Sequence, residues 1–186
     1  QGIEYTLPVA SAQVKSCVLF AGLSDNGKTF VEEPIKSRDH SERMMKMFRI
    51  PIFQNKNIIS VHALRRSIPG FDYSVPGDPS SAAYWIAAGL LLPKSKLLLR
   101  KMSINPTRTA FITLLKSVGA NIEIVEKVKS LESIVYVQVR YSSLKHFDIR
   151  SKLVPGLIDE IPLLALIATQ AKGVTTISGA KELRFQ

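Results

Sequence analysis

The chain has 186 residues, 46% of them hydrophobic and 22% charged, a balance that predicts one or two globular domains and argues against disorder. The formal net charge of +10 is carried by scattered lysines and arginines without interleaved aromatic residues, which disfavours nucleic-acid binding and leaves anionic small substrates open. No apolar stretch approaches the ~20 residues of a membrane-spanning helix and no signal peptide opens the chain, so we expect a cytoplasmic protein.

The first part of the chain predicts an alternation of helices and short strands. The segment 11–23 is apolar almost all round, with positions 14, 17, 18 and 21 on one face, which is typical of a helix buried on several sides. Asp39 and Glu42 have the spacing of a capping box, and Pro51 ends the helix that they begin. The expected elements, in chain order, are a helix over 11–23, a strand over 28–32, a helix between Asp39 and Pro51, and strands near 52–53, 58–62 and 71–75.

The same order of elements then recurs. Helices are expected to open at Ser11, Ser80 and Asp159, and the first two end in the same Ala-Gly-Leu. The further elements are a helix over 80–90, a strand over 96–101, a helix over 105–117, strands over 121–125, 134–140 and near 146–150, a helix over 157–172 and a strand over 174–178. A repeat of this size predicts an α/β fold of stacked βαβαββ units, with the helices packed inside and the sheets outside.

Prolines and glycines cluster in the segment 68–79. Such a cluster between two repeat units marks a boundary between globular bodies, so we expect residues 1–74 and 75–186 to belong to different bodies, with a hinge near 75–79. The chain begins without an initiator Met, and we therefore expect it to start inside a longer protein.

Several segments carry a resemblance to a known family. The segment 7–16, Leu-Pro-Val-Ala-Ser-Ala-Gln-Val-Lys-Ser, resembles the shikimate-3-phosphate segment of the EPSP synthase (3-phosphoshikimate 1-carboxyvinyltransferase) family. Segments 37–44, 75–83 and 157–162, followed by 179–184, resemble further blocks of that family and occur in its order. The resemblance implies the enolpyruvyl transferase fold, an inside-out α/β barrel of two lobes. Residues 1–74 would be the last repeat of the first lobe and residues 75–186 the beginning of the second, so the barrel is incomplete at both ends.

The resemblance also implies an activity. Members of the family transfer the enolpyruvyl group of phosphoenolpyruvate to the 5-hydroxyl of shikimate-3-phosphate and release phosphate, without a metal or organic cofactor. This is a step of the shikimate pathway to aromatic amino acids and the target of glyphosate. The implied partners are the two small-molecule substrates and the remaining parts of the same enzyme, with no nucleic acid and no membrane. The complete enzyme is expected to be a monomer, and the isolated segment to be inactive.

The substrate-binding residues are expected at two places in the first part of the chain. Ser11 opens a helix, where a hydroxyl, backbone N–H groups and the helix dipole favour an anion, although from the residues alone Ser11 is interpreted only as an N-cap. The resemblance implies that Ser11 and Ala12 hold the phosphate of shikimate-3-phosphate and that Gln13 lies between this substrate and phosphoenolpyruvate. It also implies that Ser37 and Arg38 contact shikimate-3-phosphate; without it, Arg38 would be a surface charge.

The catalytic residue is expected near the end of the chain. The resemblance implies that Asp159 binds shikimate-3-phosphate and is the base that deprotonates its 5-hydroxyl. From the residues alone, Asp159 could instead be an N-cap carboxylate beside Glu160, which we interpret as structural. The resemblance implies that Gln186 occupies the position at which the family has a catalytic lysine. His40 is interpreted as a first-turn helix residue, and Asp78 with the pair Ser80–Ser81 as capping and hinge residues.

Two alternatives to this function remain open. A relative acting on UDP-N-acetylglucosamine would share the fold but would lack the Ser-Ala-Gln-Val-Lys-Ser block. A non-catalytic binding or structural module with the same fold is favoured by Gln186 in place of the lysine. The single cysteine, Cys17, excludes an internal disulfide and a Cys-rich zinc site, and the motifs contain no constellation of metal ligands.

Overall fold

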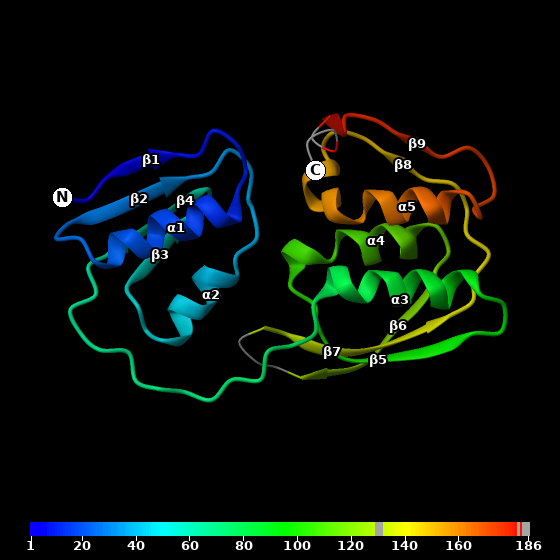
Figure 1. Ribbon diagram of the computed structural model, residues 1–186, viewed down its shortest axis with the longest axis horizontal. Coiled ribbons are helices and arrows are strands. Elements are labelled where there is room, and N and C mark those ends of the chain that lie inside the picture. The colour runs from blue at the N-terminus through cyan, green and yellow to red at the C-terminus, as the bar shows by residue number, and fades with distance from the viewer. Residues whose placement is uncertain (129–131, 182, 184–186) are drawn as a thin grey trace. The chain divides into compact units, whose positions relative to one another are not determined.

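The computed structural model describes residues 1–128, 132–181 and 183 (Figure 1). The chain divides into two compact units. Unit 1 comprises Gln1–Ser74, and unit 2 begins at Val75. Each unit has its own apolar core and is described by itself.

Unit 1 is one complete βαβαββ repeat. Its elements are β1 (Glu4–Thr6), α1 (Ala12–Leu23), β2 (Lys28–Glu32), α2 (His40–Met47), β3 (Ile52–Asn55) and β4 (Ile58–His62). The strands form one sheet in the order β1-β2-β4-β3, in which β1 and β2 are parallel and the other neighbours antiparallel. The predicted helices and the strands from β2 to β4 are confirmed, and β1 is an additional strand that the sequence pattern did not indicate.

The strand predicted over 71–75 is wrong. This stretch carries no regular structure, and Phe71 and Val75 are exposed. Pro69 and Pro76 flank it and have no N–H group to donate to a neighbouring strand. The apolar residues that suggested a strand belong instead to an extended connection between the units (Figure 1).

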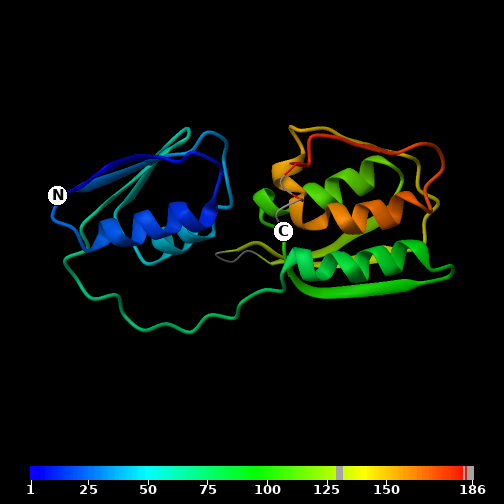
Figure 2. The same cartoon turned by 45° about the horizontal axis from the view of Figure 1, so that its top comes forward.

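Unit 2 repeats the topology of unit 1 and begins a further repeat. Its elements are α3 (Pro79–Leu91), β5 (Lys96–Ser103), α4 (Ala110–Ser117), β6 (Asn121–Val128), β7 (Ile134–Arg140), β8 (Asp148–Ile149), α5 (Ile161–Ala168) and β9 (Thr176–Ile177). The antiparallel sheet β5-β7-β6 has the same order as β2-β4-β3, while β8 and β9 form a parallel pair. Helices α3, α4 and α5 lie between that sheet and the β8–β9 pair (Figures 1 and 2), which confirms the inside-out arrangement within this unit.

Two predicted helices are shorter than expected. A 3-10 turn over Pro106–Arg108, capped by the Asn105 side chain, precedes α4, so the predicted helix over 105–117 is interrupted at Thr109. The helix predicted over 157–172 is regular only in α5, because 3-10 turns precede it and Thr169 ends it. The Thr169 hydroxyl donates to the Leu166 carbonyl at 2.7 Å and so satisfies one of the last acceptors of the helix.

The buried face of α1 differs from the predicted one. Lys15, Leu19 and Gly22 are buried against the sheet, whereas Val14 and Cys17, on the predicted face, are exposed. Because the helix is apolar almost all round, its hydrophobic pattern does not select a face. In α2, Met45 is buried, whereas Met44 and Met47 are exposed.

The glycine of the repeated Ala-Gly-Leu lies at the contact between helix and sheet in both units. A Cβ atom on Gly22 would lie 2.7 Å from the Thr29 Cβ of β2 and 2.9 Å from a methyl group of Val61 in β4. A Cβ on Gly89 would lie 3.0 Å from a methyl group of Val139 in β7 and 3.1 Å from one of Leu97 in β5. In each unit, a glycine therefore lets the first helix approach its sheet closely.

The two cores differ in size. The core of unit 1 consists of Leu7, Leu19, Val31, Met45, Ile50, Ile59 and Val61. The larger core of unit 2 is built on α3, α4, α5 and the inner face of the sheet and includes Ile86, Leu90, Leu115, Val135, Val137, Val139, Leu164 and Ile167. Among the described helices, none has the length and apolar character that crossing a membrane requires.

Candidate functional site

The N-terminus of α1 is shaped to receive an anion. Ser11 has extended backbone dihedrals, and its Oγ accepts from the Val14 N–H at 3.3 Å, so it is the N-cap that the sequence predicts. Ala12 and Gln13 follow in a first turn without an acidic residue. The first N–H groups of a helix have no acceptor within the helix and carry the positive end of its dipole, so this turn favours a negatively charged ligand.

The second predicted segment, Ser37 and Arg38, lies between β2 and α2 and is fastened to this helix. The Arg38 carbonyl accepts from Lys15 Nζ at 2.9 Å. Ser37 donates twice to Glu33 Oε2, from its backbone N–H at 3.1 Å and from its hydroxyl at 2.6 Å. The same Glu33 oxygen lies 3.1 Å from Lys15 Nζ. The structure therefore brings the two predicted substrate segments of unit 1 together through two side chains.

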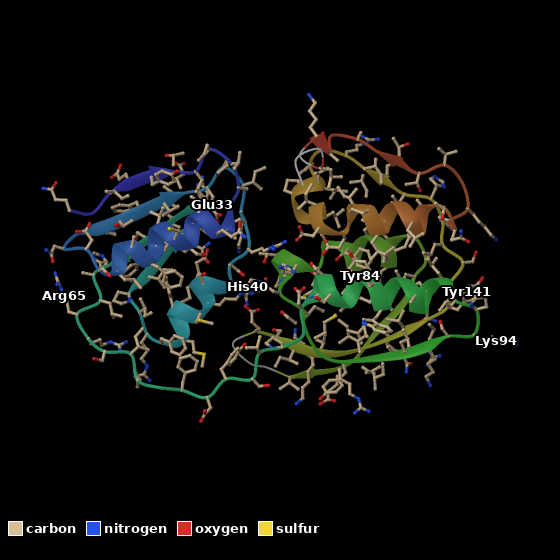
Figure 3. All side chains as sticks on the ribbon, in the orientation of Figure 1. Glu33, His40, Arg65, Tyr84, Lys94 and Tyr141 are labelled. Atoms are coloured by element: carbon tan, nitrogen blue, oxygen red, sulfur yellow. The ribbon has the colours of Figure 1, made fainter. Side chains whose placement is uncertain are left out.

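Lys15, Glu33 and Glu42 form a buried group of charges, here called the Lys15 cluster. The exposed fractions of their side chains are 0%, 1% and 2%. Lys15 projects from the sheet-facing stripe of α1, Glu33 follows directly after β2 (Figure 3), and Glu42 projects from α2 to within 2.6 Å of Lys15 Nζ. Three elements of unit 1 thus meet at one ammonium group.

The capping box predicted for α2 does not form. Asp39 occupies the N-cap position, but its side chain makes no capping hydrogen bond, and its Oδ1 accepts from Arg43 Nε at 2.8 Å. Glu42, the expected partner in the box, turns inward to Lys15 instead. Charged donors, the Arg43 guanidinium for Asp39 and the Lys15 ammonium for Glu42, compete more strongly for these carboxylates than a backbone N–H does. His40 is the first residue of α2 (Figure 3), as predicted.

Asp159 lies in unit 2, in the 3-10 turn Ile158–Glu160 that precedes α5, and its side chain is exposed. It is not the N-cap of α5, since that position is occupied by Glu160. The turn packs against α3, where the Ser80 hydroxyl donates to Glu160 Oε1. Glu160 therefore has the structural role that the sequence suggests, and its contact with α3 fixes the turn that carries Asp159.

Asp78, Ser80, Arg108 and Glu160 form a second polar group, here called the rim network. Arg108 Nη2 donates to Ser80 Oγ at 2.8 Å and to Asp78 Oδ1. Asp78 Oδ2 accepts from the Ser81 N–H at 3.0 Å, which confirms Asp78 as the N-cap of α3. Burial raises the pKa of Asp78, but the Ser81 N–H and the Arg108 charge outweigh it, so the pKa lies below its ordinary value.

The structure thus distributes the predicted site residues over both units. Those expected to bind shikimate-3-phosphate near the helix N-terminus gather in unit 1, Asp159 lies in unit 2, and Gln186 lies outside the described residues. Sequence reasoning missed the roles of Lys15, Glu33 and Arg108. A lysine inside a helix that is otherwise apolar was the available signal for the Lys15 cluster, because lysine is almost never fully buried unless it is paired.

Comparisons with known proteins agree on one family. A sequence model described as EPSP synthase (3-phosphoshikimate 1-carboxyvinyltransferase) matches residues 1–186. The chain is 48% identical to the 3-phosphoshikimate 1-carboxyvinyltransferase of Petrotoga mobilis and 49% identical to that of Endomicrobium trichonymphae. Each match covers 99% of this chain but only 43% of the relative, so the chain spans less than half of the length of these curated relatives.

Solved structures give the same result for the fold. The EPSP synthase of Acinetobacter baumannii matches with a TM-score of 0.89 and 39% identity, over 99% of this chain and 42% of that one. The enolpyruvyl transferase NikO of Streptomyces tendae matches with a TM-score of 0.65 and 20% identity, over 86% of this chain and 37% of that one, which is a likeness of fold alone.

Proposed function

The chain belongs to the EPSP synthase family, and from that premise we propose that it is part of an enzyme that transfers the enolpyruvyl group of phosphoenolpyruvate to the 5-hydroxyl of shikimate-3-phosphate. The observation that carries the proposal is the meeting of the α1 N-terminus with the Ser37–Arg38 segment in unit 1. The same premise carries the expectations of a monomeric, cytoplasmic enzyme that needs no metal or organic cofactor.

Unit 1 supplies the phosphate-binding groups in this proposal. The N–H groups of the first turn of α1 donate to the phosphate of shikimate-3-phosphate, and the Ser11 hydroxyl lies at the same helix end. Arg38 adds a guanidinium that can form a forked pair with phosphate. Gln13 is exposed on the same turn and is assigned to the region between the two substrates.

Unit 2 supplies the base. Asp159 accepts the proton of the 5-hydroxyl as the hydroxyl oxygen forms a bond to C2 of phosphoenolpyruvate and C3 gains a proton. Loss of a proton from the resulting methyl group and of phosphate from C2 then restores the double bond in the product. The exposed position of Asp159 at the start of α5 leaves its carboxylate accessible to a substrate.

Binding of shikimate-3-phosphate to the full-length protein tests the proposal, measured by titration calorimetry. Arg38→Met should raise the dissociation constant about tenfold or more, because a charged hydrogen bond to phosphate is lost. Ser11→Ala should raise it less, and added salt should weaken binding by the wild type. Arg65→Met is the matched control. His40 follows Arg38 by two residues, and Arg65 lies at the opposite end of unit 1 from His40 (Figure 3).

Two results would contradict the proposal. The first is a full-length wild-type protein that does not bind shikimate-3-phosphate, which would favour a non-catalytic module of the same fold. The second is turnover with UDP-N-acetylglucosamine in place of shikimate-3-phosphate, which would place the protein among enolpyruvyl transferases of different substrate.

A further inference from the structure

A buried group of three charges in unit 1 needs a physical reason. Removing charged groups from water is expensive, and a buried ion pair often contributes less to stability than apolar side chains of the same volume would. The Lys15 cluster holds two carboxylates and one ammonium within 3.1 Å contacts, all of them at most 2% exposed. Stability alone is therefore a weak explanation for its presence.

We propose that Lys15 and Glu33 are positioning residues that hold the Ser37–Arg38 segment against the N-terminus of α1 and so set the geometry of phosphate binding. The inference rests on the proposed function, because it assigns a purpose to that site. Lys15 lies one helical turn after Ser11, and its backbone N–H donates to the Ser11 carbonyl at 3.0 Å. A shift of Lys15 would therefore also displace Ser11, at the helix end proposed to bind the phosphate.

The contacts of Lys15 exclude a direct role in binding the substrate. Lys15 Nζ donates to Glu33 Oε1 at 3.3 Å and to the Arg38 carbonyl at 2.9 Å, and it forms an ion pair with Glu42 Oε1 at 2.6 Å. The Lys15 side chain is 0% exposed and its ammonium group is surrounded by these protein groups, which leaves no room for a substrate beside it. The charge of Lys15 acts through the backbone of Arg38, whose side chain is the group proposed to reach the ligand.

Glu33 completes the connection from the other side. Its Oε2 accepts from the backbone N–H and the hydroxyl of Ser37 while it also contacts Lys15. The segment is thus held at two consecutive residues, at Ser37 by a carboxylate that follows β2 and at the Arg38 carbonyl by a lysine of α1. Lys15 belongs to α1 and Glu33 follows directly after β2, so the Ser37–Arg38 segment is held by residues whose own positions are fixed by regular structure.

Glu33→Gln in the full-length protein is the decisive variant. It is expected to fold, because removing one of two carboxylates leaves Lys15 paired with Glu42 at equal charge. In the wild type, Lys15 Nζ donates to Glu33 Oε1 at 3.3 Å, whereas Ser37 donates to Oε2. The amide nitrogen that replaces one of these oxygens cannot accept, so either the contact to Lys15 or those to Ser37 are lost. Glu32→Gln is the matched control, since Glu32 is its neighbour, carries the same charge and is exposed.

The expected result is a separation of binding from turnover. Glu33→Gln should raise the Michaelis constant for shikimate-3-phosphate about tenfold, the effect of losing one charge-assisted hydrogen bond, and should change kcat less than about twofold. In the protein without substrate, hydrogen exchange at the Ser37 N–H should accelerate in the same variant, because this N–H donates to Glu33. Glu32→Gln should leave both quantities unchanged.

Three outcomes would overturn the inference. One is unchanged binding and unchanged exchange in a Glu33→Gln protein that is folded by circular dichroism. Another is a loss of kcat with an unchanged Michaelis constant, which would make Glu33 part of the chemistry. The third is an equal effect of Glu32→Gln, which would indicate a general effect of charge. If the wild type does not bind shikimate-3-phosphate, the proposed function fails, whereas the exchange experiment still tests the holding of Ser37.

Discussion

Unit 1 and unit 2 share the strand order of one repeat, yet they hold their proposed site segments by different means. In unit 1, a small apolar core adjoins the fully buried Lys15 cluster. In unit 2, a larger core leaves the rim network partly in water, where the Asp78 side chain is 47% exposed. The repeat thus fixes the backbone topology, while the polar supports of the site differ between its copies.

Burial decides how much a polar support contributes to the free energy of unfolding. Removing one partner of a buried pair leaves an uncompensated charge and destabilises a protein by about 3–5 kcal/mol. An exposed pair contributes about 0–1 kcal/mol, because water replaces the lost partner. Unit 1 should therefore respond strongly to the loss of the Lys15 charge, which both buried carboxylates need, and unit 2 weakly to the loss of a charge of the rim network.

The largest effect is expected on turnover, from unit 2. Asp159→Asn in the full-length protein should lower kcat by about 10²–10⁴-fold, because the amide keeps the size of the carboxylate but cannot accept the 5-hydroxyl proton. Binding of shikimate-3-phosphate should remain close to that of the wild type. Steady-state kinetics measures kcat, and calorimetry measures the binding of shikimate-3-phosphate. Near-normal turnover would mean that the base lies elsewhere in the protein.

The largest effect on stability is expected from unit 1. Lys15→Met leaves Glu33 and Glu42 buried together and should lower the free energy of unfolding by about 3–5 kcal/mol, measured by urea denaturation of the full-length protein. Lys36→Met is the matched control, since Lys36 is 54% exposed and its loss should change stability by at most about 1 kcal/mol. Equal effects of the two substitutions would contradict the comparison.

The two glycines of the repeated Ala-Gly-Leu give an intermediate effect. Gly22→Ala should destabilise by about 1–3 kcal/mol, because the new Cβ would lie under 3.0 Å from atoms of Thr29 and Val61. Gly89→Ala should be milder, since its closest neighbours lie at 3.0 and 3.1 Å and alanine raises helix propensity by about 1 kcal/mol. Thermal melts of both variants measure the difference. A larger destabilisation by Gly89→Ala than by Gly22→Ala would show that the side chains of the unit 2 sheet shift less easily to accommodate the new methyl group.

The smallest effect concerns pH and the rim network. Because the folded state lowers the pKa of Asp78 from its ordinary value of 3.8, the stabilisation is complete above that value and is lost as the pH falls through the lower folded pKa. Asp78→Asn should therefore flatten the decline of the melting temperature below about pH 4. Melting curves from pH 6 to pH 3 provide the measurement. An unchanged slope would show that Asp78 adds nothing to acid stability.

Much of the local structure could be predicted from the sequence. Capping residues, prolines and the alternation of apolar residues placed α1, α3 and the strands from β2 to β7, and Ser11 and Asp78 are the caps that their positions suggested. These signals act within one element, so a single segment of chain contains them. In 71–75, which does not form a strand, and where 3-10 turns replaced the first turns of a helix, the local signal was insufficient to predict the structure.

Local signals in the sequence were sufficient to predict the repeat, the N-caps of α1 and α3 and the motifs that indicate the family, because each depends on residues that are close together in the chain. Which face of α1 is buried, and the contacts of Lys15 with Glu33 and Glu42, depend on packing between elements that are distant in the sequence. An apolar helix has no preferred side until a sheet covers one, and a lysine in a sequence has the character of a surface residue. Its burial becomes favourable only when β2 and α2 bring two carboxylates and a carbonyl to within hydrogen-bonding distance of its ammonium group.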